Sequence, residues 1–270
     1  MYKEFYGFYE LPFNLTPDPR FLFLSDRHQE ALDHLHFGIK EAKGFIQITG
    51  EVGTGKTTLC RALLEDLGDE YHTALILNPC MTGPQLLRTI LKELHLPSGR
   101  NDRVAWLETL NQFLLDQAHE GNEVVLVIDE AQDLSPELME QVRLLSNLET
   151  DQHKLLQIIL IGQPELRRLL DEKGLRQLRQ RITVRYHLKP LSFRETEQYI
   201  RHRLHVAGGN SQPTFSRWAL RRIYQYSGGV PRLINSVCDK ALLCGYVMGT
   251  DHLKGHHLRR AIRELEGKVA

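Results

Sequence analysis

The sequence predicts an α/β fold with a parallel sheet, followed by a small helical domain. Apolar, β-branched runs alternate with amphipathic stretches, and such runs suit central parallel strands that are buried on both faces. The expected strands lie near residues 45–49, 73–77, 124–128, 155–161 and 182–188. After Pro190, Ser192 and Glu195 form the pattern of a capping box, and the apolar spacing then stays helical. We therefore expect an α/β domain over residues 1–189 and a helical domain over residues 190–270.

The first predicted strand leads into a glycine-rich loop. Residues 50–57 have the sequence GEVGTGKT, the complete pattern of a phosphate-binding loop, and a helical pattern follows over residues 59–64. Backbone N–H groups of such a loop, together with the N-terminus of the next helix, bind the oxygens of a triphosphate. The residues expected to contact ATP are Gly50, Glu51, Val52, Gly53, Thr54, Gly55, Lys56, Thr57 and Thr58.

Three side chains of this loop have distinct expected roles. Lys56 would reach the β- and γ-phosphates of ATP. Thr57 offers a hydroxyl to Mg²⁺, a hard cation that prefers oxygen ligands. Thr58 lies where the α-phosphate could be contacted. The loop therefore predicts both ATP and Mg²⁺ as ligands.

An acidic pair follows the predicted strand at residues 124–128. Asp129 and Glu130 would lie at the carboxyl end of this strand, where open α/β sheets bind their ligands. We expect Asp129 to hold Mg²⁺ through water, and Glu130 to orient and deprotonate the attacking water. Together with the phosphate-binding loop, this pair predicts that the protein hydrolyses ATP.

Further polar residues follow later apolar runs. Gln163 comes after the strand at 155–161, beside the expected γ-phosphate, and is a candidate sensor; the alternative is an ordinary turn residue before a proline. Arg179 and Arg181 adjoin the strand at 182–188, and Arg232 lies at the start of a later helix. Arginine stabilises developing phosphoryl charge through planar, permanently charged donors. An arginine in a basic segment can also be only a solvated surface residue.

The order of these motifs resembles that of the AAA+ ATPases over nearly the whole chain. Seven segments resemble the GspA/ExeA (general secretion pathway protein A) family more narrowly: YGF (6–8), PFNLTPDP (12–19), TGEVGTGKT (49–57), IDEAQ (128–132), LLSNLET (144–150), IGQPEL (161–166) and PRLIN (231–235). The pilus-biogenesis ATPases of this family end after the ATPase module, and the resemblance implies the same layout here. The resemblance implies a P-loop NTPase (AAA+) three-layer core with a parallel sheet, followed by a small all-helical lid domain.

The resemblance also implies roles for the arginines and for the N-terminal segment. Arg181 becomes the arginine finger that acts on the nucleotide of a neighbouring subunit, with Arg179 as its competitor. Arg232 becomes the lid arginine that contacts the γ-phosphate within its own chain. Residues 1–28 become an adenine-side segment of the nucleotide-binding domain.

The family resemblance implies a cytoplasmic, Mg²⁺-dependent ATPase that assembles a bacterial envelope machine. This machine is a type IV (MSHA) pilus or a type II secretion secretin. Expected partners are further copies of the chain, in a ring or other oligomer with shared active sites, and proteins of the pilus or secretion machinery. The alternative is a DNA-acting ATPase of the transposition-helper type, whose DNA affinity would depend on salt.

Composition sets bounds on partners and location. The chain has 34 Lys and Arg residues against 34 Asp and Glu residues, so the total charge favours neither nucleic acid nor membrane. Four cysteines without metal-ligand spacing are typical of free thiols in a reducing compartment. The sequence has neither a membrane-spanning stretch nor a signal-peptide pattern at its start. We expect a cytoplasmic protein at the inner face of the inner membrane, held there through partners, whether this chain is complete or part of a longer protein.

Overall fold

The computed structural model describes the chain except for residues 1, 16–17, 100–101, 151–153, 209–212 and 269–270. Its internal contacts divide the chain into two units. The core unit comprises residues 27–50 and 59–188, and the helical unit comprises residues 1–26, 51–58 and 189–270. Each unit buries hydrophobic side chains of its own.

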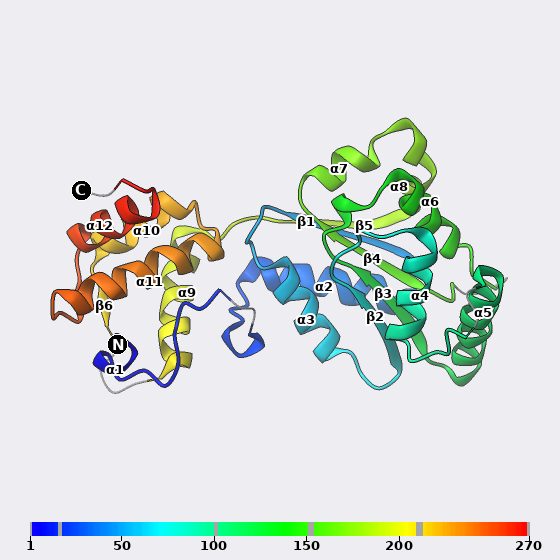
Figure 1. Ribbon diagram of the computed structural model, residues 1–270, viewed down its shortest axis with the longest axis horizontal. Helices are drawn as coiled ribbons and strands as arrows, with labels where there is room; N and C mark the ends of the chain where they lie inside the picture. Colours follow the sequence, from blue (N-terminus) through cyan, green and yellow to red (C-terminus); the bar gives the residue numbers. More distant parts are fainter. Residues whose placement is uncertain (1, 16–17, 100–101, 151–153, 209–212, 269–270) are drawn as a thin grey trace. The chain divides into compact units, whose positions relative to one another are not determined.

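The core unit is built on a five-stranded parallel sheet (Figure 1). The strands are β1 (Phe45–Gly50), β2 (Tyr71–Ile76), β3 (Glu123–Ile128), β4 (Gln157–Gly162) and β5 (Ile182–Leu188). Their order in the sheet is β2-β3-β4-β1-β5, and all neighbouring strands pair in parallel. The predicted α/β fold is confirmed, and each predicted strand lies within two residues of an observed one.

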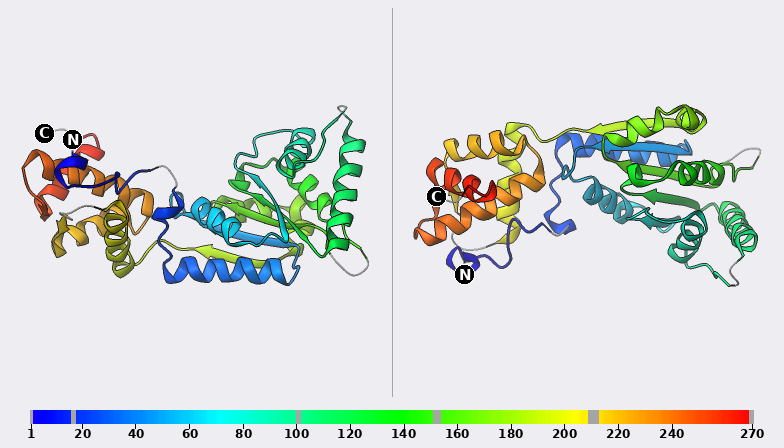
Figure 2. Two further views of the ribbon diagram at one scale, coloured as in Figure 1. Left: turned by 90° about the horizontal axis from the view of Figure 1, so that it is seen from below. Right: turned by 45° about the horizontal axis from the view of Figure 1, so that its top comes forward.

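Helices cover both faces of this sheet, as Figure 2 shows. The helices are α2 (Asp26–Lys40), α3 (Lys56–Asp66), α4 (Gly83–Glu93), α5 (Arg103–Glu120), α6 (Pro136–Leu145), α7 (Glu165–Leu170) and α8 (Arg176–Arg181). Val127 packs with Leu35 of α2 and Leu63 of α3, whereas Leu126 packs with Leu110 of α5 on the opposite face. Since successive side chains of a strand point to opposite faces, the fully apolar run of β3 is buried on both sides. This gives the predicted three-layer core.

The described part of the helical unit contains four longer helices. They are α9 (Phe193–Ala207), α10 (Arg217–Ser227), α11 (Pro231–Val247) and α12 (Gly255–Leu265), and the short α1 (Tyr2–Phe5) and η1 (Pro19–Phe21) come from the N-terminal segment. The predicted capping box starts α9: the Glu195 N–H donates to Ser192 Oγ at 3.3 Å, and the Ser192 N–H donates to Glu195 Oε2 at 2.7 Å. Among the described residues, none of the helices has the length and hydropathy of a membrane span.

This unit is not entirely helical, in contrast to the prediction. The two-residue strand β6 (Thr214–Phe215) pairs in parallel with β7 (His252–Leu253), and each strand is followed directly by a helix. A two-residue strand has too few positions to give an alternating sequence pattern, so the analysis of periodicity missed it. Because the two strands run in the same direction, the starts of α10 and α12 lie side by side.

The N-terminal segment belongs to the helical unit as far as Asp26, although we had assigned it to the nucleotide-binding domain. Tyr6, Phe8 and Phe13 are buried in one cluster with residues of α9, α10 and α11. The Tyr6 hydroxyl also donates to the Leu242 carbonyl at 3.1 Å. Burial of several aromatic side chains contributes a large apolar area, which explains this packing. A contact of the segment with adenine stays a prediction.

Arg203 of α9 holds this segment. Its Nε donates to the Pro12 carbonyl at 2.6 Å, and its Nη2 donates to the Asn14 carbonyl at 3.0 Å. Its guanidinium carbon lies 4.4 Å from the centroid of the Phe21 ring, within the range of a cation–π interaction. Arg203 is only 7% exposed, and this burial lowers the pKa of its guanidinium. The buried charge is therefore offset by two backbone carbonyls and an aromatic ring.

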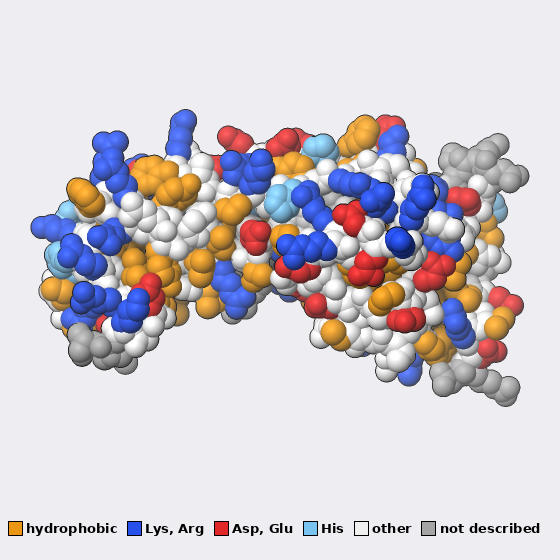
Figure 3. All heavy atoms as spheres, turned by 90° about the horizontal axis from the view of Figure 1, so that it is seen from above, with side chains coloured by type: hydrophobic (Ala, Val, Ile, Leu, Met, Phe, Trp, Pro, Cys, Tyr) orange, Lys and Arg blue, Asp and Glu red, His pale blue; other side chains and the backbone are white. Residues whose placement is uncertain are grey.

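Charge is divided unevenly along the chain. Residues 189–270 contain 14 Lys and Arg residues against 6 Asp and Glu residues, whereas residues 1–188 contain 20 against 28. On the face that Figure 3 shows, Lys and Arg side chains predominate over Asp and Glu on the helical unit, at the left. The balanced total charge of the chain therefore hides a basic C-terminal segment.

We predict that Arg203→Met lowers the free energy of unfolding by about 2–3 kcal/mol, because the buried Pro12 carbonyl and the partly buried bond to the Asn14 carbonyl lose their charged donor. Urea unfolding measures this change. The matched control is Arg201→Met on the same helix, whose side chain is exposed and pairs with Glu197 at 2.6 Å. Loss of that surface pair should cost less than about 0.5 kcal/mol. Equal effects of the two substitutions would contradict the anchoring role of Arg203.

Candidate functional site

The predicted phosphate-binding loop joins the end of β1 to the start of α3. Gly53 and Gly55 have φ angles of 79° and 98°, a conformation that favours glycine. The N–H and the hydroxyl of Thr54 donate to the Glu51 carbonyl at 3.3 and 2.8 Å, and Lys56 Nζ donates to the same oxygen at 3.1 Å. Lys56 is 6% exposed. The loop is thus closed by its own hydrogen bonds, and Lys56 folds over it.

Arg232 lies against this loop, within the helical unit. Its backbone N–H donates to the Gly53 carbonyl at 3.2 Å. A Cβ atom added at Gly53 would lie 2.5 Å from the Cβ of Arg232, so a glycine is needed for this close approach. Pro231, at the first turn of α11, starts the helix at this point. The structure therefore brings a predicted lid residue to the predicted loop, while its contact with a nucleotide stays a prediction.

Asp129 and Glu130 follow β3 at the carboxyl edge of the sheet. Asp129 is 2% exposed; its N–H donates to the Ile76 carbonyl at 2.8 Å, and its Oδ1 accepts the N–H of Glu130 at 2.9 Å. Burial, and to a lesser extent the charge of Asp129, raises the pKa of Cys60 to about 12. Asp129 is therefore close enough to Cys60, in the second turn of α3, to disfavour ionisation of its thiol.

Two amide side chains hold the carboxylate of Glu130. Its Oε2 accepts from Gln132 Nε2 at 2.8 Å and from Gln163 Nε2 at 3.2 Å. Gln132 Oε1 in turn accepts the backbone N–H of Gln163 at 2.9 Å, which fixes the orientation of the Gln132 amide. Glu130 has φ 51° and ψ 38°, a left-handed conformation that is uncommon outside glycine and concentrates at functional sites. The ends of β3 and β4 are thus linked through the predicted base and the predicted sensor.

Gln132 is a site residue that the sequence analysis missed. It lies in the short helix η2 (Ala131–Asp133), two residues after Glu130. A Cβ atom added at Gly162 would lie 2.8 Å from Gln132 Oε1, so the glycine at the end of β4 makes room for this amide. Two sequence signals could have found it: its place in the turn after the acidic pair, which keeps Gln132 at the same edge of the sheet, and its place at the end of the IDEAQ segment (128–132) that carries the family resemblance.

Arg181 and Arg179 lie at the end of α8 and have different partners. Arg181 Nη1 donates to Ser146 Oγ at 2.7 Å and to Asn147 Oδ1 at 2.5 Å. Arg179 is exposed and pairs with the carboxylate of Asp171 at 2.7 Å. A guanidinium that leaves neutral partners gives up less electrostatic energy on moving to a phosphate than one that leaves a carboxylate. This difference favours Arg181 over Arg179 as the finger.

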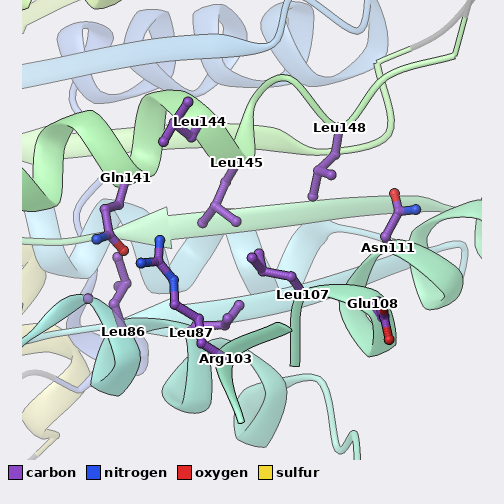
Figure 4. A pocket seen from close by; sticks show the side chains of 11 residues that line it. Leu86, Leu87, Arg103, Leu107, Glu108, Asn111, Gln141, Leu144, Leu145 and Leu148 are labelled. Carbon is purple, nitrogen blue, oxygen red and sulfur yellow. The ribbon is translucent and has the colours of Figure 1, made fainter. Parts of the chain in front are cut away.

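An apolar pocket lies beside the residues that bind Arg181. Its volume is about 370 Å³, and it lies between α4, α5 and α6 in the core unit (Figure 4). Its leucine lining consists of Leu86, Leu87, Leu107, Leu144, Leu145 and Leu148. Three of these leucines flank Ser146 and Asn147 in the chain. The segment after α6 therefore forms part of the pocket wall and also binds the candidate finger.

Comparison with known proteins identifies relatives of this chain. A family model described as an AAA domain matches residues 39–170. General secretion pathway protein A of Aeromonas hydrophila is 46% identical over 268 residues, which is 99% of this chain and 49% of that protein. The chain thus spans about half the length of the curated relative that it matches. The sequence resemblance inferred from the motifs is confirmed.

Solved structures resemble the fold as a whole. The ORC2 protein of Aeropyrum pernix has a TM-score of 0.69 at 19% identity, over 96% of this chain and 72% of that chain. The RuvB Holliday junction branch migration motor of Thermotoga maritima has a TM-score of 0.59 at 18% identity, over 90% of this chain and 70% of that chain. At these identities the likeness concerns the fold alone. The sequence match shows that this chain belongs to the AAA+ ATPases of the GspA/ExeA type.

Proposed function

We propose that this chain uses ATP hydrolysis to assemble a bacterial envelope machine, a type II secretion secretin or a type IV pilus. The name of its relative, general secretion pathway protein A, supports a role in secretion. The observation that carries the chemistry is the network around Glu130, in which two amides hold a carboxylate at the carboxyl edge of the sheet. Such an arrangement suits a base that must keep one orientation toward water.

Binding of ATP falls to the loop over residues 50–58. Its backbone N–H groups would hold the phosphates, and Lys56 would leave the Glu51 carbonyl to contact the β- and γ-phosphates. Thr57 and Asp129 are the proposed Mg²⁺ residues, and their hydroxyl and carboxylate oxygens are the donors that this ion prefers. Bound Mg²⁺ neutralises charge on the phosphate oxygens.

Hydrolysis falls to Glu130. Its carboxylate takes a proton from water as the water oxygen bonds to the γ-phosphorus and the bond to the β-phosphate oxygen breaks. Gln132 and Gln163 orient the carboxylate and, as neutral donors, leave its charge in place. Gln163 is also the proposed sensor, because its side chain follows β4 beside Glu130.

The arginines complete the proposed site. Arg181 would act as the finger on the nucleotide of a neighbouring subunit, so the chain would need to self-associate for full activity. Arg232, next to Gly53, would contact the γ-phosphate within its own chain. Arginine suits both roles because its planar donors stay charged at every relevant pH.

We predict that Gln132→Ala lowers kcat by about tenfold, because the base loses one of its two orienting donors. Glu130→Gln, which removes the base itself, should lower kcat by roughly 10²- to 10⁴-fold. Phosphate release measures both rates, and binding of a fluorescent ATP analogue should be retained in both variants. An unchanged rate in Gln132→Ala would show that the hydrogen bond to Glu130 has no part in turnover.

We predict that ATP turnover per chain rises with protein concentration, and that Arg181→Ala abolishes the rise, with a loss of about 10³- to 10⁵-fold. The rise is expected because a finger supplied by a neighbour completes the site only after association. Arg179→Ala is the matched control on the same helix and should keep the rise. A high rate that does not depend on concentration would mean that each chain carries a complete site.

We predict that Lys56→Ala in the native bacterium abolishes assembly of secretin multimers or of pili, because the loop loses its phosphate-binding cation. Gel analysis of heat-resistant secretin multimers and electron microscopy of pili measure the outcome. Immunoblotting of the variant controls for its abundance. If assembly persists while the purified variant has no turnover, the chain is an ATPase of another process.

A further inference from the structure

The starts of α10 and α12 form one continuous surface of the helical unit. The parallel pairing of β6 with β7 places them together, and a Cβ atom at Gly255 would lie 3.8 Å from the Cβ of Trp218. Several exposed basic side chains lie on these two helices and on the residue before α12. Those without an ion pair among the described residues are Arg217, Arg221, Lys254, Arg259 and Arg263. We call these residues and Trp218 the α10/α12 surface.

Nearby acidic groups neutralise little of this surface. Glu264 of α12 pairs with Arg260 at 3.3 Å and so is already engaged. Among the described residues of the loops that flank β7, Asp251 is the only acidic one, and it is exposed. Figure 3 shows Lys and Arg side chains gathered on the helical unit with few Asp and Glu side chains between them. A concentration of unpaired cations of this kind attracts an anionic partner.

Trp218 distinguishes between classes of anionic partner. It is 68% exposed, between Arg217 and Arg221 in the first turn of α10, whereas Trp106 is 4% exposed. The phosphates of duplex DNA attract cations, and an uncharged indole ring contributes little binding energy to such a contact. At the surface of a bilayer it lies at the level of the headgroups with its apolar ring directed inward. Basic residues around an exposed tryptophan therefore favour a lipid surface.

We propose that the α10/α12 surface binds the surface of a membrane that contains anionic phospholipids. Arginine and lysine side chains contact the lipid phosphates, and Trp218 inserts at the interface. The segment over residues 1–188 has 28 acidic against 20 basic residues, so attraction to the membrane is confined to the C-terminal part of the chain. This inference does not depend on ATP hydrolysis or on which machine the ATPase serves.

Sedimentation of the full chain with vesicles tests the proposal. We expect binding to vesicles of phosphatidylcholine with phosphatidylglycerol, no binding to phosphatidylcholine alone, and release by salt. R217E/R221E should weaken binding at least about tenfold. The control variant K173E/R176E changes two exposed positions of the core unit and alters the net charge by the same amount. It should bind the vesicles as the unchanged chain does. ATP turnover of both variants should stay unchanged, which separates this test from that of the proposed function.

A second variant removes the effect of net charge. W218A should weaken binding to the anionic vesicles by severalfold, since it removes the interfacial ring and no charge. Equal losses in the two double variants would overturn the proposal in favour of nonspecific attraction. Absence of vesicle binding would also overturn it. A different result would assign the surface to nucleic acid instead. The unchanged chain would then bind duplex DNA in a salt-sensitive way and would not bind vesicles, and R217E/R221E would abolish the DNA binding while W218A would leave it intact.

Discussion

The parallel register of β3, β4 and β1 is the constraint on which the core half of the site depends. Ile128 pairs with Leu160, and Thr49 pairs with Gly162, so the three strands end at nearly the same level. Chain direction then brings the residues that follow each strand to one edge of the sheet. Glu130 and Gln163 are far apart in sequence but meet through a hydrogen bond for this reason. A shift of one residue would turn alternate side chains to the other face and separate this pair.

The backbone of Glu130 shows how this edge holds a costly conformation. A left-handed backbone at a residue with a side chain costs on the order of 1–3 kcal/mol and persists only where its surroundings fix it. Here the fixing groups are Asp129, whose carboxylate accepts the Glu130 N–H, and the amides of Gln132 and Gln163. The conformation directs the carboxylate toward the end of β4. The strained backbone of Glu130, its hydrogen bonds and the glycine at residue 162 therefore belong to one arrangement. A substitution of Glu130, Gln132 or Gln163 is expected to affect the other two side chains.

Local features were predictable from the sequence, whereas features that depend on distant residues were not. The strands and the phosphate-binding loop have patterns of neighbouring residues, and the structure contains the strands where they were expected. Gln132 has no pattern of its own, because its role arises only when β4 supplies Gln163 and Gly162 beside it. Trp218 lies in an amphipathic pattern that is also typical of core packing, so its exposure follows only from the structure. The aromatic side chains of the N-terminal segment are apolar in any setting, so the sequence alone did not show that the helical unit buries them.

The arginines of this chain show why composition is a weak guide to function. Arg203 is buried against backbone carbonyls and an aromatic ring, and Arg179 is paired with a carboxylate. Arg181 is held by a hydroxyl and an amide, while Arg217 has no partner among the described ion pairs. Arg203 has little left to offer a phosphate because its donors are used in the fold, whereas Arg179 would first have to leave a carboxylate. Arg181 and Arg217 have no carboxylate partner among the described ion pairs. Which arginines act outside the fold is therefore decided by the residues that surround each guanidinium, and a count of charges alone places all four in one class.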